Sequence, residues 1–259
     1  MKRSIYLIII SIVTILCILI GAFSNLRYSG RGFRTIKRAV EKTFSSGDYD
    51  YDYDFDIDSD LVFEDDDFDE GTLEFDNEEL SKFDTVAVEG SVLGLTIERG
   101  NSYSISSKYS RPSLKPEYSL RDGKLYIKQR MKRKSLIGNN KCEVKITVPF
   151  GATIKKLDVD VDVGAVELSG FDVDTASVRT DVGAVAVSKL DFNDLYIKSD
   201  VGAVAIELLE DIKVYDIDAS SDIGAIQIGA SAVKRRFSQK GSNGKELRLK
   251  TNVGGIEIK

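Results

Sequence analysis

Apolar and polar residues alternate along most of the chain after residue 83, and a repeated nonapeptide organises this alternation. The copies read DVGAVELSG at 162–170, DVGAVAVSK at 181–189, DVGAVAIEL at 200–208 and DIGAIQIGA at 222–230, and NVGGIEIK at 252–259 is a fifth. Aligned on their glycines, they are separated by 19, 19, 22 and 30 residues. A period of two within each copy is typical of a β-strand. A period near 20 between copies is typical of a solenoid in which each coil stacks on the last.

The apolar positions of the five copies fall into four columns, which we predict to form ladders inside the solenoid. Two columns precede the glycine and two follow it. They are Leu157, Ala176, Leu195, Ile217 and Leu247; Val159, Val178, Ile197, Ala219 and Leu249; Val166, Val185, Val204, Ile226 and Ile256; and Leu168, Val187, Ile206, Ile228 and Ile258. Farther on, Phe171, Leu190 and Leu209 are expected to begin a third, short side.

The glycines are predicted to form a structural corner, because glycine is favoured where φ is positive or where a neighbouring coil approaches closely. These glycines are Gly164, Gly183, Gly202, Gly224 and Gly254. Asp162, Asp181, Asp200 and Asp222 stand two residues before them, with Asn252 in the fifth copy. We interpret this column as Asx turns that shape the corner, because Asn makes the same turn bond without a charge. A calcium ladder on the four aspartates is the weaker alternative.

Residues 83–155 are predicted to begin the same architecture in a less regular form. DTVAVEGSVLGLTIERG alternates and carries Gly94 at its corner, and YSLRDGKLYIKQR predicts two strands joined at Asp122-Gly123. Pro149 indicates an edge or a corner. The predicted fold is therefore all-β: a single-stranded β-solenoid with coils of about 20 residues over 83–259, behind an N-terminal transmembrane helix.

Three segments precede the solenoid. Residues 5–23 carry no charge and are long enough to cross the hydrocarbon core, so we assign 1–25 as a membrane anchor or uncleaved signal that contacts membrane lipid. A cleaved signal peptide is the alternative. Residues 26–46 form a basic juxtamembrane segment, and residues 1–46 carry a net charge of +7. Residues 47–82, rich in Asp and Tyr, carry −16 and are predicted to be a solvated acidic spacer.

Composition excludes several kinds of chemistry. The chain contains no His, so Ser-His-Asp triads, Cys-His dyads and His-ligated zinc are absent. Cys17 lies in the apolar segment, and Cys142 without a His is interpreted as a small strand residue. We therefore expect no enzymatic activity and no cofactor, and we expect no nucleic-acid partner.

Basic residues gather in two predicted loops, at 128–141 and 231–246. They are candidates to contact an anionic envelope polymer, lipid headgroups or an acidic partner protein. The candidates are Lys128, Arg130, Lys132, Arg133, Lys134, Lys234, Arg235 and Arg236. Solvated loops without a ligand are the alternative interpretation.

The order of motifs resembles a known family. GKLYIKQR, then KITVPFGATIKKLDVDVDVGAVELSG, the repeated VGAV corners and the terminal VGGIEI are similar to the "putative adhesin" β-strand-repeat family, the LiaG-like proteins of bacterial envelopes. The resemblance covers about residues 83–259. It implies a β-solenoid behind a membrane anchor, outside the cytoplasmic membrane, with an association with envelope stress and no catalytic residues.

Orientation in the membrane stays open at this point. The resemblance implies a single-pass protein with its β domain outside the cytoplasm. The six basic residues that follow the apolar segment favour the opposite orientation, with a cytoplasm-facing sensor or regulator domain. The expected function is thus a membrane-anchored, non-catalytic binding, structural or envelope-stress module, and a cytoplasmic sensor is the alternative.

Overall fold

Strict alternation of buried and exposed residues dictates the architecture of the folded part. The computed structural model describes residues 74–131, 140–229, 231–233 and 235–259, and the predicted anchor, basic segment and most of the spacer lie outside them. The strands are β1 (Glu74–Glu79), β2 (Thr85–Gly100), β3 (Ser104–Tyr109), β4 (Glu117–Arg121), β5 (Lys124–Gln129), β6 (Cys142–Pro149), β7 (Thr153–Ser169), β8 (Asp172–Leu208), β9 (Tyr215–Ile223), β10 (Ile226–Ile228), β11 (Ser231–Val233), β12 (Arg236–Gln239), β13 (Lys245–Val253) and β14 (Ile256–Ile258).

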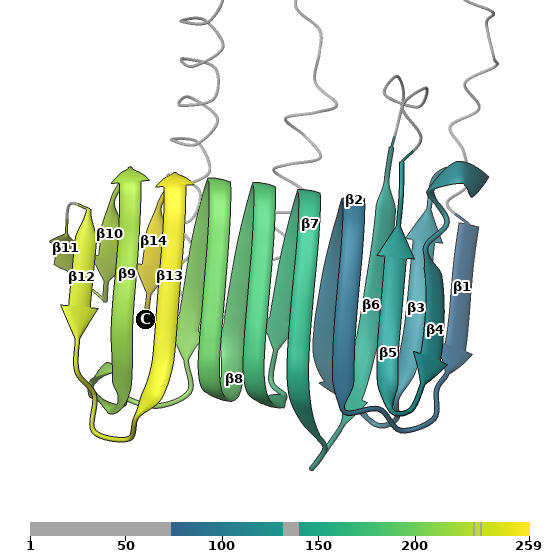
Figure 1. The fold of residues 1–259 in the computed structure, drawn as a ribbon, viewed down its shortest axis with the longest axis horizontal. Coiled ribbons are helices and arrows are strands. Elements are labelled where there is room, and N and C mark those ends of the chain that lie inside the picture. Colours follow the sequence, from purple (N-terminus) through teal and green to yellow (C-terminus); the bar gives the residue numbers. More distant parts are fainter. Residues whose placement is uncertain (1–73, 132–139, 230, 234) are drawn as a thin grey trace, which may run out of the picture. The chain divides into compact units, whose positions relative to one another are not determined.

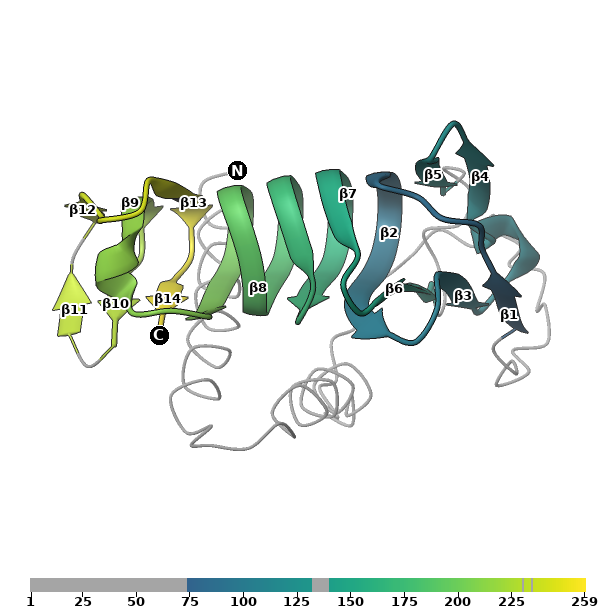
Figure 2. The same cartoon turned by 90° about the horizontal axis from the view of Figure 1, so that it is seen from below.

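These strands wind as a parallel β-solenoid, as the sequence predicts. β7 pairs in parallel with β2 on one side and with β8 on the other, and β8 is long enough to make two successive coils. Figure 1 shows the coils side by side along the long axis, and Figure 2 shows β2, β7 and β8 as turns of one winding. Among the described residues, no helix is long and apolar enough to span a membrane.

The predicted ladders form the core. Paired positions such as Leu157 and Ala176, Val159 and Val178, or Val166 and Val185 lie opposite each other on neighbouring coils and are buried. Phe171 and Leu190 are buried on the third short side, but Leu209 is 51% exposed. The prediction that Leu209 begins a third side is therefore wrong, because the chain leaves the coil after β8 and forms a short 3-10 helix at Ile212–Val214.

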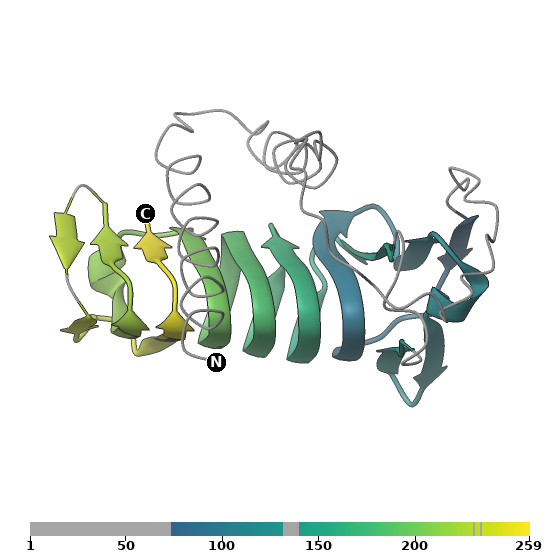
Figure 3. The same cartoon turned by 90° about the horizontal axis from the view of Figure 1, so that it is seen from above.

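The order of the coils differs from the predicted order. The fifth repeat is inserted between the third and the fourth: β13 lies between β8 and β9, and β14 lies between β8 and β10. β12 and β11 pair antiparallel with β9 and β10, and so cover the outer edge of the fourth coil. The last coil of the sequence is therefore an internal coil of the solenoid, and its ladder residues pair in register with those of both neighbouring coils. Figure 2 shows β13 and β14 between β8 on one side and β9 and β10 on the other, and Figure 3 shows the same order from the opposite side by colour.

The N-terminal end is also closed by antiparallel strands. β4 and β5 form a hairpin whose turn places Asp122 and Gly123 at φ of 51° and 72°, as the Asp-Gly pair predicts. β5 and β6 each pair with β2 and together make one outer coil, and β3 and β1 follow β6 at the edge. Because β1 pairs with β3, the folded domain begins before residue 83.

Candidate functional site

The glycine corner is the most regular surface feature of the solenoid, and close approach explains its glycines. A Cβ on Gly183 would lie 1.8 Å from the carbonyl oxygen of Gly164, and a Cβ on Gly202 would lie 1.6 Å from that of Gly183. The ridge continues from Gly202 to Gly254 and then to Gly224, each carbonyl oxygen lying within 1.9 Å of the next Cβ position. A side chain at any of these five positions would collide with the backbone of the neighbouring coil, so each of the five requires glycine.

In the first coil Leu93, not the predicted Gly94, takes the place of the corner glycine. Leu93 lies opposite Gly164, and Gly94 lies opposite Ala165. A Cβ on Gly90 would lie 2.7 Å from the Leu93 side chain, and Leu93 is fully buried. In this coil the glycine that close packing requires is at position 90, and the side chain of Leu93 packs directly against it.

A column of buried hydroxyls lies beneath the corner, and sequence analysis missed it. Thr180, Ser199, Thr251 and Ser221 each stand three residues before a corner glycine and are at most 2% exposed. Ser221 Oγ donates to the Gly254 carbonyl oxygen at 2.9 Å, and Thr251 Oγ1 donates to the same oxygen at 3.3 Å. The recurrence of Ser and Thr at this position was the available signal. Ser221 and Thr251 thus hold the Gly254 corner from inside, whereas the buried Thr180 Oγ1 and Ser199 Oγ have no hydrogen-bond partner among the described residues.

The aspartate column lies on the outside of the corner. Asp162, Asp181 and Asp222 are exposed, and Asp200 is partly exposed. The Asp200 carboxylate accepts a hydrogen bond from Asn252 Nδ2 at 2.9 Å and pairs with Lys198 Nζ at 3.0 Å, so it ties neighbouring coils together. Within the described residues, no group of three Asp, Glu or Cys side chains is arranged to hold a metal ion.

A ladder of exposed aliphatic side chains runs beside the aspartates. Val163, Val182 and Ile223 are 46%, 48% and 64% exposed, and Val201 and Val253 are partly exposed. Each stands directly after an Asp or Asn of the repeat. Sequence analysis assigned no position to these residues, because strict alternation breaks at the corner and leaves two adjacent residues facing solvent.

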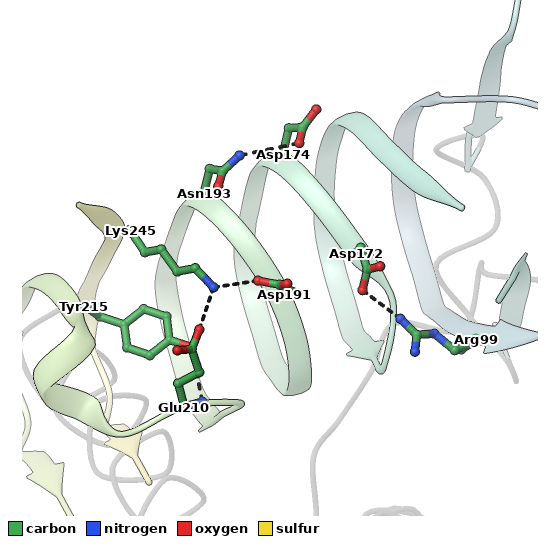
Figure 4. Close-up of polar contacts among 8 residues, drawn as sticks. All are labelled: Arg99, Asp172, Asp174, Asp191, Asn193, Glu210, Tyr215 and Lys245. Carbon is green, nitrogen blue, oxygen red and sulfur yellow. Dashed lines mark hydrogen bonds and ion pairs between the residues drawn. The ribbon is translucent and has the colours of Figure 1, made fainter. Parts of the chain in front are cut away.

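On the opposite side of the coils, ion pairs connect one coil to another. Arg99 Nη2 lies 2.7 Å from Asp172 Oδ1, and Lys245 Nζ lies 2.7 Å from both Asp191 Oδ1 and Glu210 Oε1 (Figure 4). Burial alone would lower the pKa of Lys245, but the two carboxylates outweigh it and hold the pKa above its ordinary value. These charges cross-link the solenoid along its axis.

The described basic candidates occupy the two ends of the solenoid. Lys128 on β5 pairs with Glu89 at 2.6 Å, which raises the pKa of the lysine, and Arg130 just beyond it is exposed. At the other end Arg235 is exposed, and Arg236 on β12 lies 3.3 Å from Asp218. Lys132, Arg133, Lys134 and Lys234 lie outside the described residues.

The two basic ends do not form one patch. β5 and β12 are separated by seven strand spacings through β2, β7, the two coils of β8, β13 and β9, which is about 34 Å. A ligand that reaches both ends must therefore be long.

At the end of β5, the side chain of Gln129 makes the hydrogen bonds that the backbone of a neighbouring coil makes at the other corners. Gln129 is buried, and its Oε1 accepts hydrogen bonds from the backbone N–H groups of Ser91 at 3.0 Å and Val92 at 2.9 Å. The outer coil can thus carry a long insertion at its corner without leaving these two amides of the neighbouring coil unpaired.

A comparison of the sequence with family models now decides what the repeats are. Residues 85–259 match the model described as "Toastrack DUF4097". The chain belongs to the Toastrack DUF4097 family. No curated protein sequence matches the chain. The match spans β2 to β14, so the inserted C-terminal coil lies within the Toastrack domain.

Solved structures support the Toastrack fold. A "putative cell adhesion protein" from Clostridium sporogenes is 19% identical, with a TM-score of 0.58, and the match covers 72% of this chain and 99% of that one. A "putative adhesin" from Bacteroides fragilis is 13% identical at a TM-score of 0.35, covering 73% and 97% of the two chains. A "putative lipid binding protein" from Parabacteroides distasonis is 11% identical at 0.24, covering 73% and 97%. The first of these shows that the fold is shared.

One shallow depression lies at the N-terminal end of the Toastrack domain. It has a volume of about 480 Å³ and is open to solvent between β1 and β4. Its polar lining includes Glu78, Glu79, Lys82, Tyr118 and Asp122, and Tyr118 donates a hydrogen bond to Glu78. This arrangement brings together none of the residues predicted to contact a ligand.

Proposed function

We propose that this Toastrack protein is a membrane-anchored, non-catalytic β-solenoid of the bacterial envelope that binds an anionic polymer. The uncharged segment at 5–23 supports the anchor. The shared fold with a protein named for cell adhesion supports a binding or structural role at the envelope. The proposal also includes a role under envelope stress. An acidic partner protein would use the same basic residues.

The observation that carries this proposal is the separation of the exposed basic residues. Arg130 and Arg235 lie at opposite ends of the solenoid, about 34 Å apart. A single phosphate or headgroup reaches one end only, whereas a chain of anionic groups reaches both. Attachment at two points raises the apparent affinity because the second contact forms within an existing complex.

A non-catalytic role is supported by how the carboxylates are used. Asp172, Asp191, Asp200 and Glu210 pair with cations or amides of neighbouring coils or of the adjoining linker. Carboxylates held in this way serve as cross-links in the scaffold. The exposed Asp162, Asp181 and Asp222 follow the same regular column along one corner.

Retention on an anionic cell-wall polymer tests the proposal. We expect the full-length double variant Arg130→Glu, Arg235→Glu to be retained less than the wild type, with the loss greatest at low salt. The matched control is Lys156→Glu, Lys250→Glu, which makes the same change in charge at exposed lysines of the middle coils. Equal retention of the two double variants would reject the basic ends as the binding site.

The cytoplasm-facing sensor is the second candidate, and the basic segment after the apolar stretch favours it. A cysteine at the exposed Ser242, in a chain with Cys17→Ser and Cys142→Ser, reports the side of the membrane. Labelling of intact cells by an impermeant thiol reagent supports the envelope proposal. Labelling only after cell lysis supports the sensor.

A further inference from the structure

The last two repeats form a self-contained stack at the C-terminal end of the solenoid. β9 pairs with β12 and β13, and β10 pairs with β11 and β14. The connection to β13 is held within the same stack, because Gly241 N–H donates to Asp216 Oδ1 at 2.6 Å. We call residues 215–259 the C-terminal module and residues 74–208 the body.

Strand pairing between the module and the body runs, in the described residues, through one edge only. β13 pairs in parallel with residues 194–201 of β8, and β14 pairs with residues 204–206. β9 and β10, which the sequence places directly after β8, pair with other strands of the module and not with β8. The whole module thus docks on β8 through the coil formed by β13 and β14.

A few side chains complete this docking edge. Lys245 of the module reaches Asp191 of the body at 2.7 Å, and the ring of Tyr215 lies 5.3 Å from that of Phe192 (Figure 4 shows the lysine and the tyrosine). Asn252 Nδ2 donates to Asp200 Oδ1 at 2.9 Å. Every one of these contacts joins a module residue to a body residue, so each can form equally well between two chains.

The linker between body and module leaves the path of the coils. Leu209 is 51% exposed, although Phe171 and Leu190 are buried at the equivalent positions of the two preceding coils. Glu210 and Asp211 are exposed as well. Residues 209–211 are therefore a surface connection, whereas Ile212 and Val214 pack against the core and residues 212–214 are hydrogen-bonded to the module and move with it. The linker can be extended at 209–211 without opening the core of either part.

We propose that the C-terminal module is exchangeable: it docks on β8 of its own chain or on β8 of a second copy. The exchanged dimer keeps the strand pairs and side-chain contacts of the docking edge and differs only in the path of the linker, which is the usual basis of domain swapping. Closed monomers are favoured in dilute solution, because the module stays at high effective concentration near its own body. Crowding of copies favours exchange.

Disulfide trapping between two tagged full-length copies tests the exchange. One copy carries Val201→Cys and the other Val253→Cys, with Cys17→Ser and Cys142→Ser in both. Val201 and Val253 are partners across the docking edge, and both are partly exposed. We expect co-expressed copies to form a disulfide-linked heterodimer in several-fold excess over a control pair.

The matched control joins Val163→Cys to Val253→Cys. Val163 is exposed on the same ladder, but its partners are Val92 and Val182, so it is never next to Val253 in a monomer or in an exchanged dimer. Heterodimer at or below the level of this control would overturn the proposal.

Linker length provides a second measurement. Deleting residues 209–211 should increase the heterodimer, because the module then fails to reach its own β8, and inserting Gly and Ser residues should decrease it. A heterodimer yield that does not respond to insertion would exclude residues 209–211 as the hinge. If the deletion variant does not accumulate, the insertion and the native linker decide the question.

Discussion

A single missing methyl group sets the spacing of the coils at their tightest point. The carbonyl oxygen of each corner glycine occupies the volume where the next glycine would carry its Cβ. At Gly183 and Gly202 the backbone is not in the left-handed region, so close approach alone explains the residue. The sequence predicts glycine at the corner either because φ is positive or because a neighbouring coil approaches closely. Close approach applies at all five corner glycines, and positive φ at only three of them.

Gly183→Ala should therefore destabilise the protein strongly. Its Cβ would lie 1.8 Å from the Gly164 carbonyl oxygen, and relief requires a shift of backbone between two coils. We expect a loss of about 3 kcal/mol or more in the free energy of unfolding, measured by denaturant titration. Gly151→Ala is the control, since Gly151 has φ of +74° with no atom within 4 Å of the Cβ position. It should cost only about 1–2 kcal/mol, and equal losses would contradict the steric explanation.

Glu167 carries a penalty that depends on pH. Burial, together with the nearby Glu98, raises the pKa of Glu167 above its ordinary value of 4.5, and Lys145 only partly offsets this. The folded state then holds the proton more tightly than the unfolded state, so this residue lowers stability as pH rises above about 4.5. Glu167→Gln should raise the free energy of unfolding slightly at pH 7, by less than about 1 kcal/mol, and change it little at pH 4, as measured by denaturant titration at the two pH values. A gain of the same size at both pH values would contradict the argument.

At the scale of strands, identical ladder positions make the order of coils degenerate. Ala219 of β9 and Leu249 of β13 belong to the same column, so either strand fits beside Ile197 of β8. In the observed order β11 and β12 cover one side of the fourth coil by antiparallel pairing, and β13 and β14 occupy its other side. Local pattern thus determines register, and the position of a coil depends on strands far along the chain.

Cysteine pairs on the exposed aliphatic ladder distinguish the two orders within one chain. Val201→Cys with Val253→Cys should form an internal disulfide, because these residues lie on neighbouring strands. Val201→Cys with Ile223→Cys should not, because Val253 lies between them and two strand spacings, about 10 Å, exceed the reach of a disulfide. Mobility of the oxidised monomer on a non-reducing gel, with and without reductant, gives the answer. A disulfide between positions 201 and 223, and none between 201 and 253, would show that β9 stacks directly on β8 in the order of the sequence.

Much of this architecture follows from the sequence, and the exceptions have physical causes. The ladders, the glycine corner, the Asp122-Gly123 turn and the buried Cys142 are local consequences of alternation and turn chemistry. The exposed valines and the buried hydroxyls were missed because a corner breaks the period of two on which burial was inferred. Leu93 at the corner could not be predicted, because its side chain packs against Gly90 three residues earlier in the same strand, and only the bend of the chain at the corner brings the two together.

For the molecule as a whole, the C-terminal residues are an interior part and not an end. Leu247, Leu249, Ile256 and Ile258 are at most 1% exposed and lie between two other coils. Burial of each such side chain contributes about 1.5–3 kcal/mol, so together they match the stability of a typical small domain.

Removal of residues 245–259 should therefore release the module from the body. We expect limited proteolysis of the truncated protein to cut from residue 209 onward and to leave a protected fragment that ends near Leu208. Lys259→Ala is the control and should leave the digestion pattern unchanged, because the side chain is exposed and the backbone bonds of residue 259 to Ile206 and Leu208 are kept. Protection of residues 215–239 in the truncated protein would mean that β9 had stacked directly on β8.

The inserted last coil also governs how the protein matures during synthesis. The coils of β7 and β8 can wind one after another as the chain emerges from the ribosome, but the edge of β8 at residues 194–206 finds its partner only in residues 245–259, which are made about 40 residues later. Until residues 245–259 have been made, every nascent chain displays an unpaired parallel edge to its neighbours on the same messenger. The pause between making that edge and covering it is the interval in which polysome-bound copies are most able to entangle.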